Sequence, residues 1–296
     1  MSPTTHISIS REQVLERTRS MPSFPTVVSQ IIATLDDTDS TITIVAKAIS
    51  RDPLICARVL AAANTVTLRG QNHSPVWDLF SAISLIGLNR VRHITLISAL
   101  SGFWSGSLGR KTTSGFWQHS VCAGIACEEV ALQTACPVSA SLALIAGLLH
   151  DIGQLWLYHL NPTLTPLLLE QSRQNHICLS DIERDYFGVN HATIGKWLAE
   201  HWGLPPAVSA AIGCHHQPNQ ALEHPLVSLV HVAEVICNAL DLPSREENQV
   251  TYLSQDACQQ LGLDWSDSNR SEIRSLFGRI EARSQHALTF FNSPQP

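Results

Sequence analysis

Apolar residues recur at the three- and four-residue spacing of an α-helix along almost the whole chain. In the first half, this spacing predicts helices that begin near Pro25, Ile42, Pro53, Leu79 and Val91. In the second half, it predicts helices over 116–134, 138–149, 181–187, 191–202, 207–216 and 226–240, with two weaker helices between 253 and 291. Apolar and polar residues do not alternate over any stretch long enough to suggest a β-strand. The pattern therefore predicts an all-α protein.

The stretch from Ser101 to Gly115 interrupts this pattern with four glycines. Glycine is a strong breaker of local structure, so we predict a linker between two helical subdomains here. A phosphate-binding loop is excluded, because the glycines do not fit the spacing G-x-x-x-x-G-K-[ST].

Composition narrows the class of protein. Only 15% of the 296 residues are charged, against about 25% in an average globular domain. The net charge of -6 argues against a nucleic-acid-binding surface, which is normally basic. No apolar run approaches the roughly 18 residues that a membrane helix needs, and the N-terminus lacks the apolar core of a signal peptide. The eight cysteines form no C-x-x-C motif, which favours free thiols. We predict a cytoplasmic protein that binds neither nucleic acid nor a membrane.

Histidine is concentrated in the second half, where ten of the 14 histidines lie between His119 and His231. A single histidine on a helix carries little information, but here two adjacent pairs occur, His150–Asp151 and His215–His216. Imidazole and carboxylate groups are ligands of divalent cations such as Zn²⁺, Mn²⁺ and Fe²⁺. The sequence therefore predicts a metal site built from seven donors on several helices: His119, His150, Asp151, His191, His215, His216 and Glu234.

The order of these donors, with HD at residues 150–151 and a late carboxylate on a helix, is similar to that of the HD superfamily of phosphohydrolases. A longer pattern resembles one branch, the HDOD (HD-related output) domain of bacterial signalling proteins. The D-P…N-[ST] block within residues 49–65 points to that branch. The resemblance spans roughly residues 14 to 240 through MPSFPTVVSQIIATLDD (21–37), ISRDPLICARVLAAANT (49–65), SAISLIGLNRVRHI (81–94), FWQHS (116–120), GLLHDIGQL (147–155), FGVNHATIGKWLAEHWGLPPAVSAAIGCHHQP (187–218) and LVHVAEVI (229–236).

The resemblance implies a fold in which an N-terminal helical bundle packs on an HD-like helical subdomain. On this basis we predict a tail over residues 1–13, the bundle over 14–112, the HD-like subdomain over 113–241 and a C-terminal helical extension over 242–296. The resemblance also implies a regulatory output module that acts with other signalling proteins, such as receiver or cyclic-dinucleotide domains. No receiver domain fits within these residues, so we expect a stand-alone module or the output part of a longer protein. Apolar surfaces of the bundle could also support a homodimer.

The resemblance assigns the seven donors to two groups. The residues that correspond to the HD metal ligands are His119, His150, Asp151 and Glu234. The residues that fall where the related HD-GYP phosphodiesterases hold a second metal are His191, His215 and His216. The implied cofactor is one or two ions of Fe, Mn or Zn.

Three departures from the HD-GYP pattern argue against turnover. Gln154 stands where those enzymes have a lysine that contacts phosphate, Glu234 replaces an aspartate, and QPNQALEHP (217–225) contains no G-Y-P. We therefore predict a signalling module without turnover, as for most HDOD proteins, which have no established enzymatic activity. The alternative is a metal-dependent phosphohydrolase or phosphodiesterase that acts on a nucleotide or cyclic dinucleotide. In that case Asp151 would be the catalytic residue, bridging two metal ions and holding the attacking water.

Overall fold

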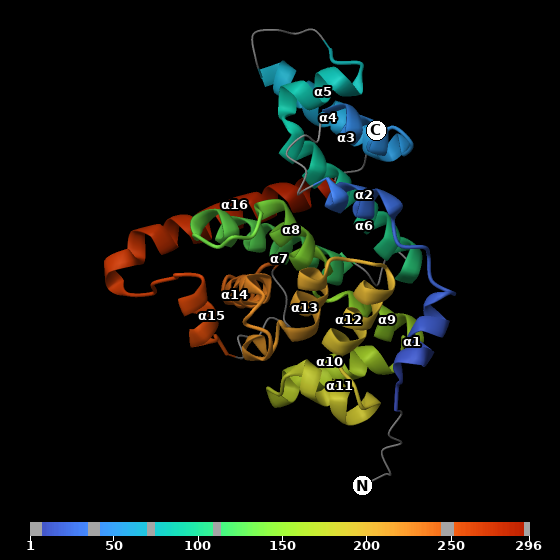
Figure 1. Cartoon of the computed structure of the whole chain (residues 1–296), viewed down its shortest axis with the longest axis vertical. Coiled ribbons are helices and arrows are strands. Elements are labelled where there is room, and N and C mark those ends of the chain that lie inside the picture. The colour runs from blue at the N-terminus through green and yellow to red at the C-terminus, as the bar shows by residue number, and fades with distance from the viewer. Residues whose placement is uncertain (1–7, 35–41, 70–74, 109–113, 244–251, 293–296) are drawn as a thin grey trace. The chain divides into compact units, whose positions relative to one another are not determined.

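The computed structural model describes residues 8–34, 42–69, 75–108, 114–243 and 252–292 (Figure 1). Every regular element in these ranges is a helix, so the predicted all-α fold is confirmed. The eight cysteines all lie in the described ranges and are free thiols, as predicted. The chain divides into two compact units, one formed by Ser23–Gly106 and the other by Met1–Pro22 together with Ser107–Pro296.

The unit Ser23–Gly106 consists of helices around a common apolar cluster. Its helices are α2 (Thr26–Ala33), α3 (Ile42–Ile49), α4 (Pro53–Arg69), α5 (Leu79–Ile86) and most of α6 (Leu88–Leu108). The start of α4 is fixed by Asp52, whose carboxylate accepts the backbone N–H groups of Leu54 and Ile55 at 2.9 and 3.1 Å. The buried cluster consists of Val45, Ile49, Ile55, Val59, Ala62, Ala63, Ala82, Ile83, Val91 and Ile94.

The glycine-rich stretch is helical for longer than the sequence predicts. We expected a linker from Ser101, but α6 continues without a break to Leu108. A glycine within a helix, such as Gly102, costs only about 1 kcal/mol relative to alanine. Phe103 and Trp104 are buried, and the free energy gained from their burial outweighs that cost. The next part of the predicted linker, residues 109–113, lies outside the described residues.

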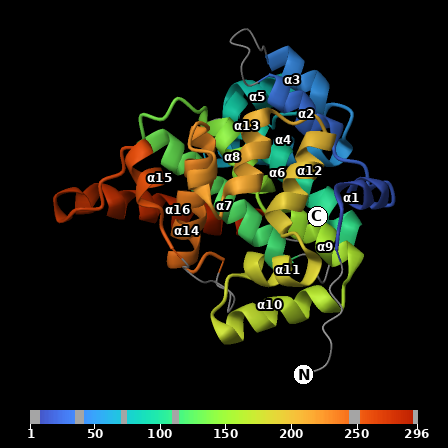
Figure 2. The ribbon, with the colours of Figure 1, turned by 60° about the horizontal axis from the view of Figure 1, so that its bottom comes forward.

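The second unit is centred on the junction between α8 (Ala140–Leu149) and α9 (Ile152–Leu160). α8 packs closely on α7 (Ser114–Gln133), because a Cβ atom at Gly147 would lie 2.7 Å from the carbonyl oxygen of Ala123. Three further helices complete the group, as Figures 1 and 2 show: α12 (His191–His201), α13 (Pro206–Cys214) and α14 (Pro225–Ala239). This group of helices positions the predicted metal ligands.

Three helices of this unit are missing from the sequence-based prediction: α1 (Arg11–Thr18), α9 and α10 (Leu164–Asn175). In α9 every residue from Ile152 to Tyr158 is buried, so the helix has no polar face to produce the periodic signal. α10 lies beside α11 (Leu179–Phe187) at the edge of the unit (Figure 2).

The stretch Ala140–Leu160 is long and apolar enough to cross a membrane by length and composition. This differs from our expectation that no run approaches that length, because α8 and α9 follow one another with only His150 and Asp151 between them. In the structure, 83% of its most apolar segment is buried inside the fold, where it packs against the neighbouring helices.

Both ends of the chain contribute helices to the second unit. α1 (Arg11–Thr18) contacts α12, and Arg11 lies 3.0 Å from the carboxylate of Glu200. Residues 14–22 group with this unit in the structure, whereas the sequence-based limits assign them to the N-terminal bundle. At the other end lie α15 (Gln255–Gln260) and α16 (Arg270–Asn292), the two helices expected between 253 and 291. Arg279 on α16 pairs with the buried Glu129 on α7 at 2.8 Å. Short 3₁₀ turns occur at Pro218–Gln220 and Asp267–Asn269.

Candidate metal centre

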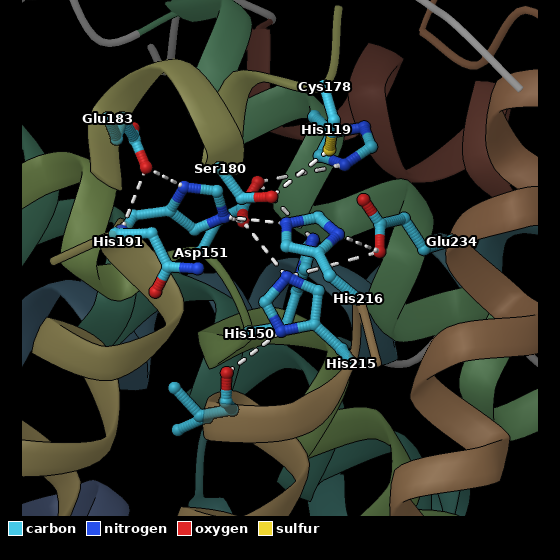
Figure 3. Close-up of polar contacts among 12 residues, drawn as sticks. His119, His150, Asp151, Cys178, Ser180, Glu183, His191, His215, His216 and Glu234 are labelled. Atoms are coloured by element: carbon cyan, nitrogen blue, oxygen red, sulfur yellow. Dashed lines mark hydrogen bonds and ion pairs between the residues drawn. The ribbon is translucent and has the colours of Figure 1, made fainter. Parts of the chain in front are cut away.

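The structure brings all seven predicted donors to one place. Figure 3 shows their side chains directed toward a common centre. His119 comes from α7, Glu234 from α14, and His191 is the first residue of α12. The two adjacent pairs lie at helix ends, His150–Asp151 between α8 and α9 and His215–His216 directly after α13. The donors form three overlapping groups whose ligand atoms lie within 4.8 Å of one another, as ligands of a shared ion would.

Asp151 lies in the middle of this set. Its Oδ1 atom is 3.4 Å from Nε2 of His191 and 3.7 Å from Nε2 of His215. Its Oδ2 atom is 3.3 Å from Nε2 of His150 and 3.9 Å from Nε2 of His119. Each carboxylate oxygen therefore faces two histidines, an arrangement suited to a carboxylate that bridges two cations.

Glu234 and His216 form the outer part of the centre. The Oε2 atom of Glu234 is 3.8 Å from Nδ1 of His216 and 4.0 Å from Nε2 of His215. On its other side, His216 Nε2 is 2.8 Å from Nε2 of His191. Burial raises the pKa of the Glu234 carboxyl to about 7, while burial and the neighbouring histidines hold the pKa of His216 well below its ordinary value. His216 therefore offers a neutral ring nitrogen to a cation.

Two of the histidines are fixed from behind by helix carbonyls. His150 Nδ1–H donates to the carbonyl oxygen of Gly147 at 2.7 Å, and His215 Nδ1–H donates to that of Ile212 at 2.8 Å. These carbonyls lie in the last turns of α8 and α13, where backbone acceptors lack helical partners. Because the Nδ1 proton is used in this bond, Nε2 of the neutral ring carries a lone pair toward the centre.

A third histidine is fixed by Glu183, a residue that the sequence analysis missed. The Oε2 atom of Glu183 accepts the backbone N–H of His191 at 2.8 Å and its Nδ1–H at 2.5 Å. Glu183 is fully buried on α11, four residues before Phe187 and on the same buried face. A charged residue on the apolar face of a helix is the sequence signal that could have identified it, because an ionised carboxylate is seldom buried without a partner.

The position of His191 depends on a close approach of α9 and α12. A Cβ atom at Gly153 would lie 1.9 Å from the carbonyl oxygen of His191, so only glycine fits there. Gly153 follows Asp151 by two residues, and the contact therefore places the start of α12 directly against the central carboxylate.

The histidines of this cluster differ in their pKa values, and therefore in how strongly they hold a proton when no metal is bound. Burial disfavours the charge on His150, but the Asp151 carboxylate outweighs it and raises the pKa of His150 to about 9. Burial likewise opposes the charge on His191, and Glu183 outweighs it, so the pKa of His191 also rises to about 9. The pKa of His215 lies well below its ordinary value because of burial and the charge of His150. A divalent cation could replace the two protons that stabilise this cluster of carboxylates.

The donor set fits a divalent metal ion. His150 Nε2, His215 Nε2 and Asp151 Oδ1 are buried and make no hydrogen bond. A buried polar atom without a partner costs about 1–3 kcal/mol, so these convergent atoms favour a ligand between them. Nitrogen and carboxylate oxygen donors together suit Fe, Mn or Zn better than Mg or Ca. The identity and number of ions remain predictions.

A cavity of about 360 Å³ opens beside the donors. Its lining includes His119, Asp151, His191 and Glu234, together with Gln154 from α9. Gln154 and Glu234, two of the three departures from the phosphodiesterase pattern, thus both line the cavity. The donors can therefore be reached by a small molecule.

The fold is similar to several solved structures, each 22% identical to this chain. An HDOD domain protein of unknown function from Geobacter sulfurreducens matches with a TM-score of 0.71, over 92% of this chain and 97% of its own. A candidate signal transduction protein from Marinobacter aquaeolei VT8 matches with a TM-score of 0.75, over 98% of this chain and 64% of its own. A candidate phosphohydrolase from Shewanella amazonensis SB2B matches with a TM-score of 0.66, over 92% and 97%. At this level of identity the similarity concerns the fold.

Similarity in sequence identifies the family. An uncharacterized protein of Treponema pallidum (strain Nichols) is 25% identical over 240 residues, which is 80% of this chain. The match covers 45% of that protein, so this chain spans about half the length of the curated relative it matches. The model of the HDOD domain family matches residues 21–218, which contain every predicted donor except Glu234. The chain therefore belongs to the HDOD domain family.

Proposed function

We propose that this protein is a signal-transduction module of the HDOD type that holds one or two divalent metal ions and acts by binding other signalling proteins. The observation that carries the proposal is the convergence of seven donors around Asp151, with buried nitrogen and oxygen atoms that make no hydrogen bond. A structural or sensory metal at this position would tie α7, α8, α12, α13 and α14 together. Metal occupancy would then change the stability of the unit.

The partners that we propose are receiver or cyclic-dinucleotide domains, either in the same protein or in another one. The cytoplasm is the proposed location, and a homodimer formed through the N-terminal bundle is a further proposal. Nucleic acid and membranes are not proposed as partners, because the net charge of -6 is unfavourable for both phosphate-rich surfaces.

The positions of Gln154 and Lys196 favour a module without turnover. Gln154 lines the cavity and can donate a hydrogen bond to a phosphate, but it brings no positive charge. Lys196 is not among the residues that line the cavity, and its methylene groups lie against Gly213 on α13, where a Cβ atom would be 2.8 Å from Lys196 Cδ. Transition states of phosphoryl transfer need positive charge near the transferred group, so both features weaken catalysis.

The second candidate is a metal-dependent phosphohydrolase that acts on a nucleotide or cyclic dinucleotide. The cavity of about 360 Å³ beside the donors favours it, because a purely structural metal site is normally closed. When bound, the metal would polarise a phosphoryl oxygen and lower the pKa of a water molecule. Asp151 would orient that water through its carboxylate, and Gln154 would hold an oxygen of the substrate.

Elemental analysis combined with a phosphatase and phosphodiesterase panel tests the proposal. Protein purified without a chelator should contain about one or two ions of Fe, Mn or Zn per chain. Asp151→Ala should lose the metal, whereas His201→Ala, which changes an exposed histidine at the end of α12, should retain it. Less than one metal ion per chain would contradict the metal claim. Turnover that disappears in Asp151→Ala would instead establish the phosphohydrolase.

A further inference from the structure

The unit Ser23–Gly106 presents large apolar side chains to solvent at α5. Trp77, two residues before this helix, is 83% exposed, and Phe80 in its first turn is 58% exposed. Leu85, near the end of the helix, is 44% exposed. Tryptophan is highly buried on average in folded proteins, so a ring as open as that of Trp77 is unusual. A contiguous group of exposed apolar side chains marks a contact with another molecule, whereas single ones do not.

The exposed residues gather on the outer side of α5 and at its start. Within the helix they are spaced by three and four residues, which places them on one side. The opposite side carries Ala82 and Ile83, which are buried in the apolar cluster that α5 shares with α3 and α4 (Figure 1). The residues of the outer side, here called the α5 face, are Trp77, Phe80, Ser81, Ser84 and Leu85.

The backbone is fixed on both sides of Trp77. Before it, the Asn64 side chain holds Val76: Nδ2 donates to the carbonyl oxygen of Val76 at 3.0 Å, and Oδ1 accepts its N–H at 2.8 Å. After it, Asp78 caps α5 by accepting the N–H of Ser81 at 2.8 Å. The chain around the exposed ring is therefore ordered before any partner binds, which reduces the entropy lost on binding.

Asn64 belongs to the D-P…N-[ST] block, the part of the sequence that points to the HDOD branch. The other end of that block, Asp52, caps α4, and neither residue is one of the seven predicted metal donors. In the structure Asn64 instead holds the segment that presents Trp77. The block thus serves the surface of the bundle.

The charges around the α5 face favour a second copy of the same face. None of its five side chains is charged, so two copies can meet without repulsion. Asp78 at the start of α5 is exposed, and so is Arg90, three residues beyond the Gly87 cap that ends the helix. When two copies of α5 pack antiparallel, the start of each lies beside the end of the other. A two-fold axis then places Asp78 of each copy near Arg90 of the other.

The exposed area is of the size that a dimer needs. An aromatic side chain can bury about 150–250 Å², so the exposed parts of Trp77 and Phe80 amount to roughly 300 Å². A stable interface buries about 800 Å² on each partner, and the two rings supply more than a third of that area. Large aromatic side chains at the centre of an interface also contribute most to its binding energy.

We propose that the α5 face is the surface through which two copies of this protein form a two-fold dimer. Trp77 and Phe80 of the two copies pack against one another at the centre, and pairs between Asp78 and Arg90 close the rim. The inference rests on the proposed function only for the homodimer, to which it gives a surface, and it is independent of the metal centre.

Sedimentation equilibrium of the full chain between about 1 and 100 µM tests the inference. We expect a dimer that dissociates on dilution. Trp77→Gln and Phe80→Gln should each raise the dimer Kd at least about 100-fold, because each removes an aromatic ring from both copies. Leu132→Gln is the matched control, since Leu132 is a 65% exposed leucine on α7, and it should leave Kd unchanged. Circular dichroism verifies folding, and if Trp77→Gln is misfolded, Phe80→Gln decides the question.

Charge variants test the antiparallel arrangement. Asp78→Asn retains the helix cap, because asparagine caps as well as aspartate, but it removes the charge. Arg90→Gln removes the opposite charge. Each should raise Kd about 2- to 30-fold, since the exposed pair occurs twice in the dimer, and the double variant should be no weaker than the more affected single one. Arg274→Gln, which changes an exposed arginine on α16, is the control. Additive effects of the two changes would overturn this arrangement.

The outcomes separate this inference from the proposed function. A dimer whose Kd is the same in folded Trp77→Gln and Phe80→Gln would overturn the α5 face and leave the homodimer intact. A chain that stays monomeric up to about 100 µM would overturn the homodimer and its surface together. Neither result bears on the metal ions, which elemental analysis tests separately.

Discussion

Glu183 provides the sharpest test of how the metal centre is built. Its carboxylate accepts both the backbone N–H and the Nδ1–H of His191, and neither residue is more than 1% exposed. In Glu183→Gln the amide oxygen retains the shape of the acceptor but loses the charge. Bonds to charged groups contribute about 1.5–3 kcal/mol, against about 0.5–1.5 kcal/mol for neutral ones. We therefore expect the free energy of unfolding to fall by about 1–3 kcal/mol.

The same change should weaken metal binding through His191. Carboxylates behind a metal-ligating histidine orient the ring and raise its basicity, and their loss typically costs about 10- to 100-fold in metal affinity. Competition with a chromophoric chelator measures the affinity, and circular dichroism verifies that the variant is folded at the temperature used. Glu16→Gln is the control, since Glu16 is exposed on α1.

The two measurements together decide whether Glu183 acts on the metal centre. A folded Glu183→Gln protein whose metal affinity stays within about twofold of the original would refute the role of Glu183 in orienting His191. A loss of stability without a loss of metal affinity would have the same meaning, because the carboxylate would then serve only to satisfy buried donors.

Further predictions concern the helix contact at Gly153 and the protons of the centre. Gly153→Ala places a Cβ atom 1.9 Å from the carbonyl oxygen of His191 and should lower the free energy of unfolding by about 3 kcal/mol or more in urea denaturation. Gly102 in α6 has open space around its Cβ position, so Gly102→Ala should instead raise the free energy of unfolding by up to about 1 kcal/mol. Equal effects of the two changes would contradict the close approach of α9 and α12 at Gly153. Metal affinity should rise between about pH 7 and 9, because His150 and His191, each with a pKa of about 9, must lose their protons to bind. Calorimetry in buffers of different ionisation enthalpy measures that proton release, and binding that releases no protons would contradict the assignment.

The amino-acid sequence by itself determined the class of fold and most of the candidate metal centre. Helical spacing of apolar residues is a local property, so helices with one buried and one exposed face could be predicted from it. The seven donors could be predicted because their residue types are uncommon together and two pairs are adjacent in the chain. The order of motifs also identified the family, which the match over residues 21–218 supports.

Only the tertiary structure decided the features that depend on contacts between distant segments. α9 escaped prediction because it is buried on all sides, and α6 passes through Gly102 because Phe103 and Trp104 are packed in the interior. Glu183 lies eight residues before His191, yet its role depends on the packing of α11 against α12. The cavity beside the donors arises in the same way. Burial and close approach are properties of the assembled fold, and no local periodicity records them.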